Sequence, residues 1–507
     1  MTTERKPRSR RRAGGKGATH SSSGPTKSNF VREVGYFDLV APDALNMLHE
    51  ASCEILEEIG IEFRHDTALE IWRGAGARVD GQRVYIPRDL LMGLVAKAPS
   101  EYIYNARNPA RNVRIGGKNM GFAPTYGCPF IRDVNGVRRY AKLSDLEDLV
   151  KLTHLSAPLN ISGSIICEPV DVPVPHRHLE VARTHLKLGE KPIMGSVTSA
   201  DNARDCVEIA KLVWGSDFLP DNVVMTNLVN CNSPLVWDDT MLDAAMVYAE
   251  HGQAMMLAPF AMQGANSPIT TAGTVAQVNA EALAGIAFVQ LVRPGNPVVY
   301  GAPVSVVSMK SGSPMYATSD GQHSNFVLGQ LARRYGIPYR VSGARTGSKT
   351  LDAQAGYETV LALMPSLMTG VNYVLHAAGW LESVLTVATD KFVMDVEVLT
   401  VLQRMLAGMP VNAETLALDT IREVGPGGHH FASAHTLKHY ESAFFMPETF
   451  DVNSFEQWSA AGELSSADVA KKKAADLLAN YEAPEIDAAL TREIDRFVDA
   501  RKGEIKA

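Results

Sequence analysis

A full positive charge stands in a turn that has few other side chains. The stretch RVSGARTGSKTLDAQAGYE, residues 340–358, begins like the end of a buried strand and finishes like the start of a helix, with Arg345 in the Gly- and Ser-rich turn between them. Barrel and doubly wound folds keep their chemistry on such turns. A guanidinium there can bind a carboxylate as a planar two-pronged donor. The alternative is an ion pair with a rim carboxylate such as Glu168 or Glu382.

Other polar residues also stand at the ends of apolar runs. His376 ends the run VNYVLHAAG, where its imidazole can hydrogen-bond a substrate carboxylate or orient Arg345; a satisfied core histidine is the alternative. Asn227, Asn230 and Gln263 are weaker candidates, because an amide in a loop can serve only to satisfy backbone groups. The sequence therefore predicts a polar site built from several strand ends.

Two sets of residues raise the question of a metal. GPGGHHFASAHTL contains His429 and His435, and Gly-rich turns with clustered imidazoles can hold a metal or a phosphate, but this spacing is not a standard zinc pattern. Cys167 and Cys231 follow two of the apolar runs and can offer thiolates, although the five cysteines form no CxxC pair and are expected as buried free thiols. We expect no metal at the site.

Eight repeating units position these residues. Short apolar runs alternate with longer amphipathic stretches, the pattern of a parallel sheet covered by helices, and eight such units predict a (β/α)₈ TIM barrel, fold class α/β. No strand is followed by GxGxxG, which disfavours a dinucleotide-binding fold. Asp201, Asp239 and Asp352 are the expected N-caps of three of the helices. The apolar runs are residues 119–125, 159–169, 192–198, 222–230, 254–264, 297–304, 338–344 and 371–379.

The barrel is expected to have additions at both ends. A helix with Pro42 in its first turn and Gly60 at its end, followed by short strands and helices, indicates a small N-terminal α/β cap. Helical patterns after the eighth unit indicate a helical C-terminal extension. The predicted domains are a disordered basic tail at 1–34, the cap at 35–115, the catalytic barrel at 116–410 and the extension at 411–507.

Composition limits the possible partners. The chain has 507 residues, 46% of them hydrophobic and 21% charged, which is typical of a globular protein with a large core. The first 27 residues hold eight basic side chains and one acid, so the rest carries a formal charge of −14, which disfavours nucleic acid as a partner of the folded body. We find no apolar run long enough to span a membrane and no secretory signal pattern, so a cytoplasmic protein with no membrane contact is expected.

The order and the amino-acid sequences of these segments resemble those of the trimethylamine methyltransferase family of corrinoid-dependent methyltransferases. The resemblance rests on the first helix, NAEALAGIAFVQLVRPGNPVVYG at 279–301, SKTLDAQAGYE at 348–358, EVGPGGHHF, and WSAAG near 458. It covers nearly the whole chain after residue 35. It implies a barrel that passes a methyl group from a methylated amine to cobalt(I) of a corrinoid (cobalamin) on a separate carrier protein, with no cofactor bound tightly to the barrel itself.

One position departs from the family members that use trimethylamine. Those members carry pyrrolysine in the turn after the seventh strand, whereas this sequence has Arg345 there, after Gly343-Ala344. The chain is thus similar to the branch without pyrrolysine, whose characterised members demethylate quaternary amines such as glycine betaine. A quaternary nitrogen has no lone pair for pyrrolysine to capture and is already a good leaving group, so positioning carries most of the catalysis.

The resemblance gives the candidates their roles. Arg345 would anchor the carboxylate of a betaine, with His376 beside it, and Glu382 would match a family glutamate that organises the mouth or faces the corrinoid partner. His429 and His435, in a turn shared with similar sequences, would be structural or face the partner. Gln263 and Asn227 would contact the substrate. Cation–π contacts with its ammonium group would come from strand-end aromatic residues: Tyr126, Phe260, Tyr300, Tyr316 and Trp380.

Other functions stay open on the sequence alone. The same chemistry can act on trimethylamine, proline betaine, carnitine or choline. A betaine-binding protein that has kept the pocket without catalysis is a different class of function that the residues also allow. A homo-oligomer is expected from the habits of large barrels.

Overall fold

The computed structural model describes residues 29–505 and has a nearly closed barrel at its centre. Six regular parallel strands follow one another in the hydrogen-bonded order β10, β12, β14, β17, β18, β7. Their bounds are Asn119–Phe122 for β7, Thr226–Cys231 for β10, Ala254–Pro259 for β12, Val298–Gly301 for β14, Tyr339–Ser342 for β17 and Tyr373–Leu375 for β18. Five of the six fall within the runs that the sequence predicted as strands, and β10 extends one residue beyond its run of 222–230.

Irregular chain completes the barrel between β7 and β10. Residues 159–163 and 192–195 belong to the runs 159–169 and 192–198, which were predicted as the second and third strands. They form only isolated bridges, of which Gly163–Ile193 and Ile193–Met225 are parallel. The amide of Ile161 donates to the carbonyl of Phe122 at 3.1 Å, and the amide of Met194 donates to that of Gly163 at 2.8 Å. The eight predicted segments are therefore present in the expected order, two of them without regular pairing.

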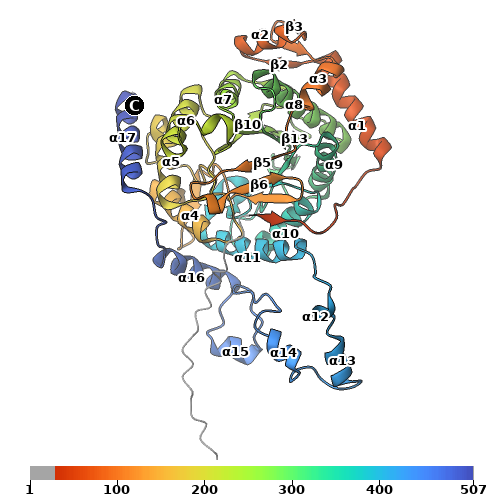
Figure 1. Ribbon diagram of the computed structural model, residues 1–507, viewed down its shortest axis with the longest axis vertical. Helices are drawn as coiled ribbons and strands as arrows, with labels where there is room; N and C mark the ends of the chain where they lie inside the picture. The colour runs from red at the N-terminus through yellow and green to blue at the C-terminus, as the bar shows by residue number, and fades with distance from the viewer. Residues whose placement is uncertain (1–28, 506–507) are drawn as a thin grey trace, which may run out of the picture.

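A helix follows every one of the eight segments, and these helices surround the strands (Figure 1). This arrangement confirms the predicted alternation of strands and helices. The eight helices are α4 (Leu143–Leu155), α5 (Arg177–Leu188), α6 (Ala200–Trp214), α7 (Asp239–Glu250), α8 (Thr271–Val292), α9 (Ser319–Tyr335), α10 (Ala353–Met368) and α11 (Thr389–Leu406).

Helix starts agree with the sequence to within two residues. Asp352 caps α10 as predicted, accepting from the amide of Ala355 at 2.9 Å. The other two helices begin earlier than expected, so that Ser199 caps α6 and Asp238 caps α7. Asp201 and Asp239 lie in the first turns instead, where a carboxylate also complements the helix dipole.

The segment before the barrel packs over α8. It contains α1 (Pro42–Glu54), the π-helical turn η1 (Ile55–Ile59) that ends at Gly60, α2 (Asp66–Gly74) and α3 (Arg88–Val95). Its strands β2 (Ile61–Phe63), β3 (Arg78–Asp80) and β4 (Arg83–Tyr85) join β11 (Val236–Trp237) in a second sheet. Because α1 and α3 contact the side of α8 that faces away from the strands, α8 is buried on all sides.

The burial of α8 explains its composition. Within the described residues it is the one helix long and apolar enough to cross a membrane, with 22 residues and a mean hydropathy of 1.5. In this fold 89% of its apolar window is buried inside the molecule. Its apolar surface therefore forms part of the protein core.

A hairpin enters one end of the barrel. β5 (Glu101–Tyr104) and β6 (Val113–Gly116) extend the sheet from β7, and Figure 1 shows them across the middle of the ring. Tyr102 and Tyr104 pack with Met256 of β12 and Tyr373 of β18 in one buried cluster that is separate from the main core. This cluster is the barrel interior, and the hairpin closes it at the end where the strands begin.

Two small sheets of short strands lie at the opposite end of the barrel, where the barrel strands end. β19 (Trp380–Leu381), β20 (Thr386–Ala388), β8 (Phe130–Arg132) and β9 (Arg138–Tyr140) form one small sheet, in that order. β13 (Ala261–Gln263), β15 (Val304–Val307) and β16 (Pro314–Met315) form another. Both sheets come from loops after barrel strands, so they build the mouth of the barrel.

The chain after α11 first leaves the barrel and then returns to it. α12 (Ala413–Leu416), α13 (Leu418–Val424), α14 (Ala434–His439) and α15 (Phe455–Ala460) lie apart from the ring of helices in Figure 1. α16 (Ser466–Ala479) then packs on α11 and α4, and α17 (Ala488–Glu504) packs on α5 and α6. Short 3₁₀ turns complete the chain: η2 (Pro109–Arg111), η3 (Val174–His176), η4 (Leu219–Asp221) and η5 (Glu382–Val384).

Most of the predicted basic tail, residues 1–28, lies outside the described residues. Its last part has structure: β1 (Phe30–Val31) pairs with β7, and the buried guanidinium of Arg32 donates to the carbonyl of Leu367. Residues 30–33, predicted as part of the disordered tail, are thus bonded to the barrel.

Candidate active site

β17 and the turn after it place two arginine side chains inside the barrel. Its residues alternate, so Tyr339 and Val341 pack in the core outside the strands while Arg340 and Ser342 point the other way, to the interior. Arg345 follows three residues after the strand ends, and both arginines are at least 97% buried. The seventh barrel segment thus supplies two guanidinium groups to the mouth end of the interior.

Arg345 has few partners for a buried cation. Its Nη1 lies 3.4 Å from the Oγ of Ser305, and its guanidinium carbon lies 4.3 Å from the centre of the Tyr316 ring. Its Nε and Nη2 have no hydrogen-bond partner within residues 29–505. The two rim carboxylates considered as partners are engaged elsewhere, Glu168 with Arg177 at 3.4 Å and Glu382 with Arg138 at 2.7 Å. The ion-pair alternative for Arg345 is therefore wrong in this structure.

Arg340 is a second unpaired cation, and the sequence analysis missed it. Its Nη2 lies 3.5 Å from Nδ1 of His376, and its Nε has no partner among the described residues. A signal was present in the sequence, because an arginine inside the apolar run PYRVSGA shares a strand face with Ser342. Taking Arg340 as part of the site gives two adjacent guanidinium groups without a counter-charge.

Burial lowers the pKa of both guanidinium groups without neutralising them. Burial lowers the pKa of Arg340 to about 9, with a further contribution from the charge of Arg345. Burial also lowers the pKa of Arg345 to about 10, although the Tyr316 phenol acts in the opposite direction. Both groups stay charged at pH 7. Two buried charges with open donors form a strong site for an anion, because an anion would supply the missing hydrogen bonds and charge.

His376 is held beside the arginines in an uncommon backbone conformation. It ends the eighth segment with φ at 68°, a left-handed value that costs energy for a residue with a side chain. Burial lowers the pKa of its imidazole well below the usual value, and the charges of Arg340 and Arg345 add to the effect. Since a guanidinium can only donate, Nδ1 accepts from Arg340, and Nε2 carries the hydrogen of a neutral imidazole.

Trp380 and Tyr126 lie next to this group in the order of the strands. The rings of His376 and Trp380 stack with centroids 3.9 Å apart, and the indole nitrogen donates to the Sγ of Cys128 at 2.6 Å. Tyr126 is half-buried against the interior cluster. Because β17, β18 and β7 are consecutive in the sheet, Arg345, the Trp380–His376 stack and Tyr126 follow one another around the mouth.

Glu382 organises the mouth rather than the interior. Its carboxylate accepts from Arg138 of β9 at 2.7 Å and from the hydroxyl of Thr386 in β20 at 2.6 Å. Its amide donates to the carbonyl of Ser348, in the turn that follows Arg345. It thus connects the loop after β18 with the loops after β7 and β17.

Two predicted substrate contacts face away from the interior. Tyr300 lies on the outer face of β14, where its hydroxyl donates to Asn279 of α8 at 2.8 Å, so it packs in the helical layer. The side-chain amide of Asn227 joins neighbouring segments, since its Oδ1 accepts from the amide of Gly195 and its Nδ2 donates to the carbonyl of Ala254. The structure therefore places both residues in supporting positions.

The remaining candidates lie at the rim or beyond it. Phe260 is 56% exposed after β12. Gln263 donates to the carbonyl of Ile269 at 2.9 Å, and its Oε1 is buried without a partner in the described chain. His435 lies beside Glu414 and His439, whereas His429 contacts Phe431, so the turn does not bring His429 and His435 together.

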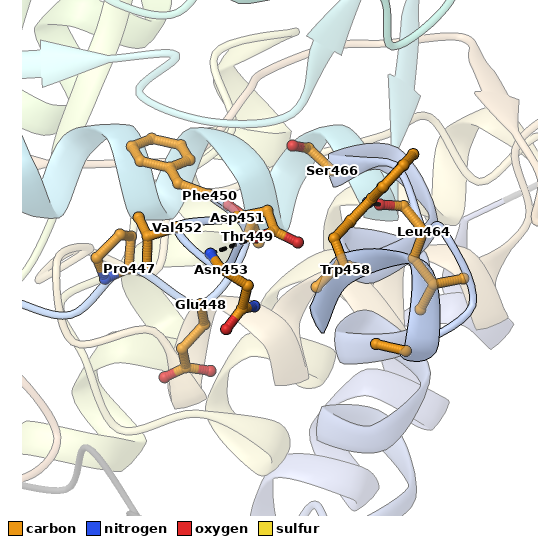
Figure 2. Close-up of a pocket in the computed structure, with 12 residues that line it drawn as sticks. Pro447, Glu448, Thr449, Phe450, Asp451, Val452, Asn453, Trp458, Leu464 and Ser466 are labelled. Atoms are coloured by element: carbon orange, nitrogen blue, oxygen red, sulfur yellow. Dashed lines mark hydrogen bonds between the residues drawn. The ribbon is translucent and has the colours of Figure 1, made fainter. Parts of the chain in front are cut away.

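Two further features do not add to this site. Cys167 and Cys231 are buried, and burial raises the pKa of both thiols well above the usual value, so neither is a ready thiolate. A cavity of about 260 Å³ lies between residues 447–453 and helices α15 and α16 (Figure 2), and none of the predicted site residues lines it. The candidate site is the arginine cluster inside the barrel.

Comparisons with known proteins show which proteins the chain is similar to. The chain is 38% identical over 470 residues to "Glycine betaine methyltransferase" of Desulfitobacterium hafniense, a match that covers 92% of this chain and 98% of that one. It is 28% identical over 485 residues to "Proline betaine:corrinoid methyltransferase" of Eubacterium limosum, covering 92% and 99%. The crystal structure of the Methanosarcina barkeri monomethylamine methyltransferase (MtmB) shares its fold, with a TM-score of 0.52, 11% identity, and coverage of 91% and 90%. Residues 5–506 match the family described as "Trimethylamine methyltransferase (MTTB)", and the chain belongs to this family.

Proposed function

We propose that this protein transfers a methyl group from a quaternary amine of the glycine betaine type to cobalt(I) of a corrinoid carried by a separate protein. The observation that carries the proposal is the pair of buried guanidinium groups, Arg340 and Arg345, which find no carboxylate among the described residues. A betaine has a carboxylate close to its ammonium group and would supply the missing partner. Names of the relatives favour the same substrate class.

The carboxylate end of the substrate would be fixed first. Arg345 has two free donors and Arg340 has one, so together they can hold both carboxylate oxygens. The neutral His376 adds a possible third donor, its Nε2–H. Fixing this end determines where the trimethylammonium group lies, and such positioning lowers the barrier to a displacement reaction.

The ammonium end calls for a weaker grip. Cobalt(I) supplies the electron pair for the new bond to the methyl carbon, while the nitrogen keeps the pair of the broken bond and loses its positive charge. A carboxylate of the protein in contact with the ammonium group would stabilise the starting state more than the transition state. Aromatic faces hold a quaternary ammonium less strongly, and we assign this role to Tyr126 and Trp380.

The two arginines would also make the site specific for methylated amines that carry a carboxylate. Choline and trimethylamine lack a carboxylate, so binding either would leave two buried cations uncompensated. Proline betaine and carnitine carry a carboxylate and differ in shape, so they are the closer alternatives. A betaine-binding protein without catalysis would use the same contacts.

The test is a substrate panel with the full-length protein and reduced cobalamin as methyl acceptor. We expect methylcobalamin to form, followed by its absorption spectrum, with glycine betaine and much more slowly with choline or trimethylamine. Conversion of choline or trimethylamine as fast as betaine would overturn the carboxylate assignment. Thermal stabilisation by betaine without spectral conversion would establish the non-catalytic alternative.

The proposal also covers the domains, the contacts with the carrier protein, the cofactor and the oligomeric state. We assign residues 35–115 to a cap, 116–410 to the catalytic barrel and 411–507 to an extension. The corrinoid carrier would approach the mouth, with Phe260, His429 and His435 as candidate contacts. No tightly bound cofactor is needed for this chemistry, and we expect a cytoplasmic homo-oligomer.

A further inference from the structure

The four helices α12 to α15 lack a core of their own. None of them contains a buried residue, and Figure 1 shows them beyond the ring of barrel helices. Apolar burial normally fixes the position of a helix, so a segment without it needs another constraint. We call residues 412–465, which contain these helices, the arm.

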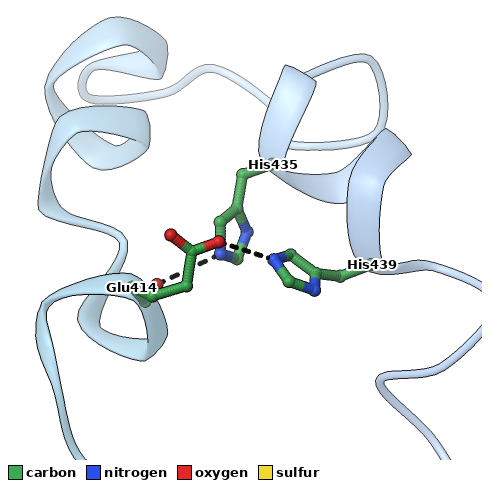
Figure 3. Close-up of side chains that lie close together, drawn as sticks. All are labelled: Glu414, His435 and His439. Atoms are coloured by element: carbon green, nitrogen blue, oxygen red, sulfur yellow. Dashed lines mark hydrogen bonds and ion pairs between the residues drawn. The ribbon is translucent and has the colours of Figure 1, made fainter.

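One polar cluster joins two helices of the arm. His435 and His439 are one turn apart on α14, with ring centroids 4.6 Å apart, and both face Glu414 of α12 (Figure 3). Nε2 of His439 lies 2.9 Å from Oε1 of Glu414, and Nε2 of His435 lies 3.3 Å from the backbone carbonyl of the same residue. One ligand atom from each of the three side chains falls within 4.8 Å of the others.

These side chains have the chemistry of a zinc-type site. Two histidines at i and i+4 on a helix present both imidazoles on one face. Two imidazoles and one carboxylate are a known ligand set for Zn²⁺, which binds such groups at about 2.0–2.2 Å. Small rotations of partly exposed side chains would bring the three ligand atoms onto one ion. The ammonium group of Lys438 lies 2.5 Å from Oε1 of Glu414 and would have to leave. Because its side chain is 64% exposed, it can turn into water at little cost.

We propose that Glu414, His435 and His439 bind a divalent transition-metal ion, with zinc as the best match, and that the ion fastens α12 to α14 in the arm. The ion would have three protein ligands and an open side toward solvent, so water or a residue of a partner can complete its coordination. The site is separate from the arginine cluster and does not depend on the proposed methyl transfer. It differs from the His429–His435 pairing considered from the sequence.

Metal binding is tested on the full-length protein after dialysis against a chelator. Zinc alone is added back and counted per chain by equilibrium dialysis and elemental analysis. We expect about one zinc per chain, and at least a tenfold loss of affinity in His435→Ala and in His439→Ala. His429→Ala is the matched control from the same turn and should bind as the original chain does. Equal zinc binding by the original chain and by a variant lacking both His435 and His439 would overturn the proposal.

A second variant separates a metal site from a simple ion-pair cluster. Lys438→Met removes the ammonium group that competes for Glu414, so a metal site predicts tighter zinc binding. Hydrogen exchange in residues 412–440 supplies a readout of structure: zinc should slow exchange in the original chain and in Lys438→Met, but not in the variant without the two histidines. Looser zinc binding by Lys438→Met, or exchange that zinc does not change, would contradict the proposal.

Discussion

At the scale of single residues, two buried arginines in the barrel interior destabilise the fold and at the same time offer a binding site for an anion. Arg340 and Arg345 are buried next to each other, and three of their nitrogen atoms lack a partner within the described chain. A buried charge without a counter-ion destabilises a fold by several kcal/mol unless something else compensates it. Proteins retain such groups where they serve function, so stability and activity should respond to substitution in opposite directions.

Arg345→Met tests that opposition. Loss of the buried cation should raise the midpoint of thermal unfolding. Loss of a charged hydrogen bond to substrate, worth about 2–3 kcal/mol, should weaken betaine binding about 30- to 150-fold. Arg345→Lys keeps the charge but not the two-pronged donor, so its binding loss should be smaller. Calorimetric titration and thermal melts measure the two effects. Arg204→Met, at an exposed ion pair on α6, is the control and should change neither. Unchanged affinity in Arg345→Met would show that this guanidinium does not bind the substrate.

Residue types were easier to predict than strand faces. Arg345 and His376 were recognised because a charge or an imidazole at a strand end is conspicuous. Tyr300 was assigned to the site and Arg340 was missed for one common reason: β14 and β17 pair with Tyr300 opposite Tyr339 and Gly301 opposite Arg340, so both tyrosines face the helices. A run that is apolar on both faces does not reveal which face is the interior. That information comes from the barrel as a whole.

At the scale of elements, the alternating pattern predicted eight units because a longer helical stretch follows each short apolar run. It did not predict that residues 159–163 and 192–195 would close the barrel through isolated bridges. Gly163, which forms one of these bridges, has a left-handed φ of 89°, and Pro192 has no amide hydrogen to donate, so neither continues a regular strand. The composition of a short apolar run does not show whether its hydrogen bonding is regular. The small sheets at the mouth were missed as well, since strands of two to four residues leave no periodic signal.

The turn after β17, which carries Arg345, lies against the turn after β18, which carries His376, and their contact at Gly343 fixes the distance between them. Gly343 lies where an added Cβ would stand 2.8 Å from the carbonyl oxygen of His376 and 2.9 Å from the Cα of Ala377. These are backbone atoms, so they cannot rotate away. Gly343→Ala should therefore separate the turn carrying Arg345 from the turn carrying His376, and should lower the free energy of unfolding by about 1–3 kcal/mol.

Gly356→Ala is the matched control, because an added Cβ there meets no atom within 4 Å and the residue lies inside α10. It should raise the free energy of unfolding by about 0.5–1 kcal/mol through better helix propensity. Urea unfolding gives both values, and betaine affinity should fall only in Gly343→Ala. A Gly343→Ala protein with unchanged stability and affinity would mean that the two turns do not constrain each other.

At the scale of the whole molecule, stability also depends on a buried imidazole that does not belong to the arginine cluster. His185 of α5 is 2% exposed, donates through Nε2 to the carbonyl of Ser164, and accepts through Nδ1 from the hydroxyl of Ser162 at 2.7 Å. These bonds satisfy a neutral ring, and burial lowers the pKa of His185 to about 4. The unfolded chain, with a histidine pKa of about 6.5, therefore binds a proton that the folded chain does not bind between these values.

This difference makes stability depend on pH. Because the unfolded state holds more protons between about pH 4 and 6.5, the free energy of unfolding falls as the pH is lowered through that range, by about 2 kcal/mol from pH 7 to pH 5 for one such histidine. His185→Gln cannot take up this proton, so its stability should decline less over the same interval, even if it is lower at pH 7. Urea unfolding at pH 7, 6 and 5 measures the two slopes, with the exposed His323→Gln as control. Equal slopes in His185→Gln and the original chain would show that His185 is not the group whose protonation weakens the fold.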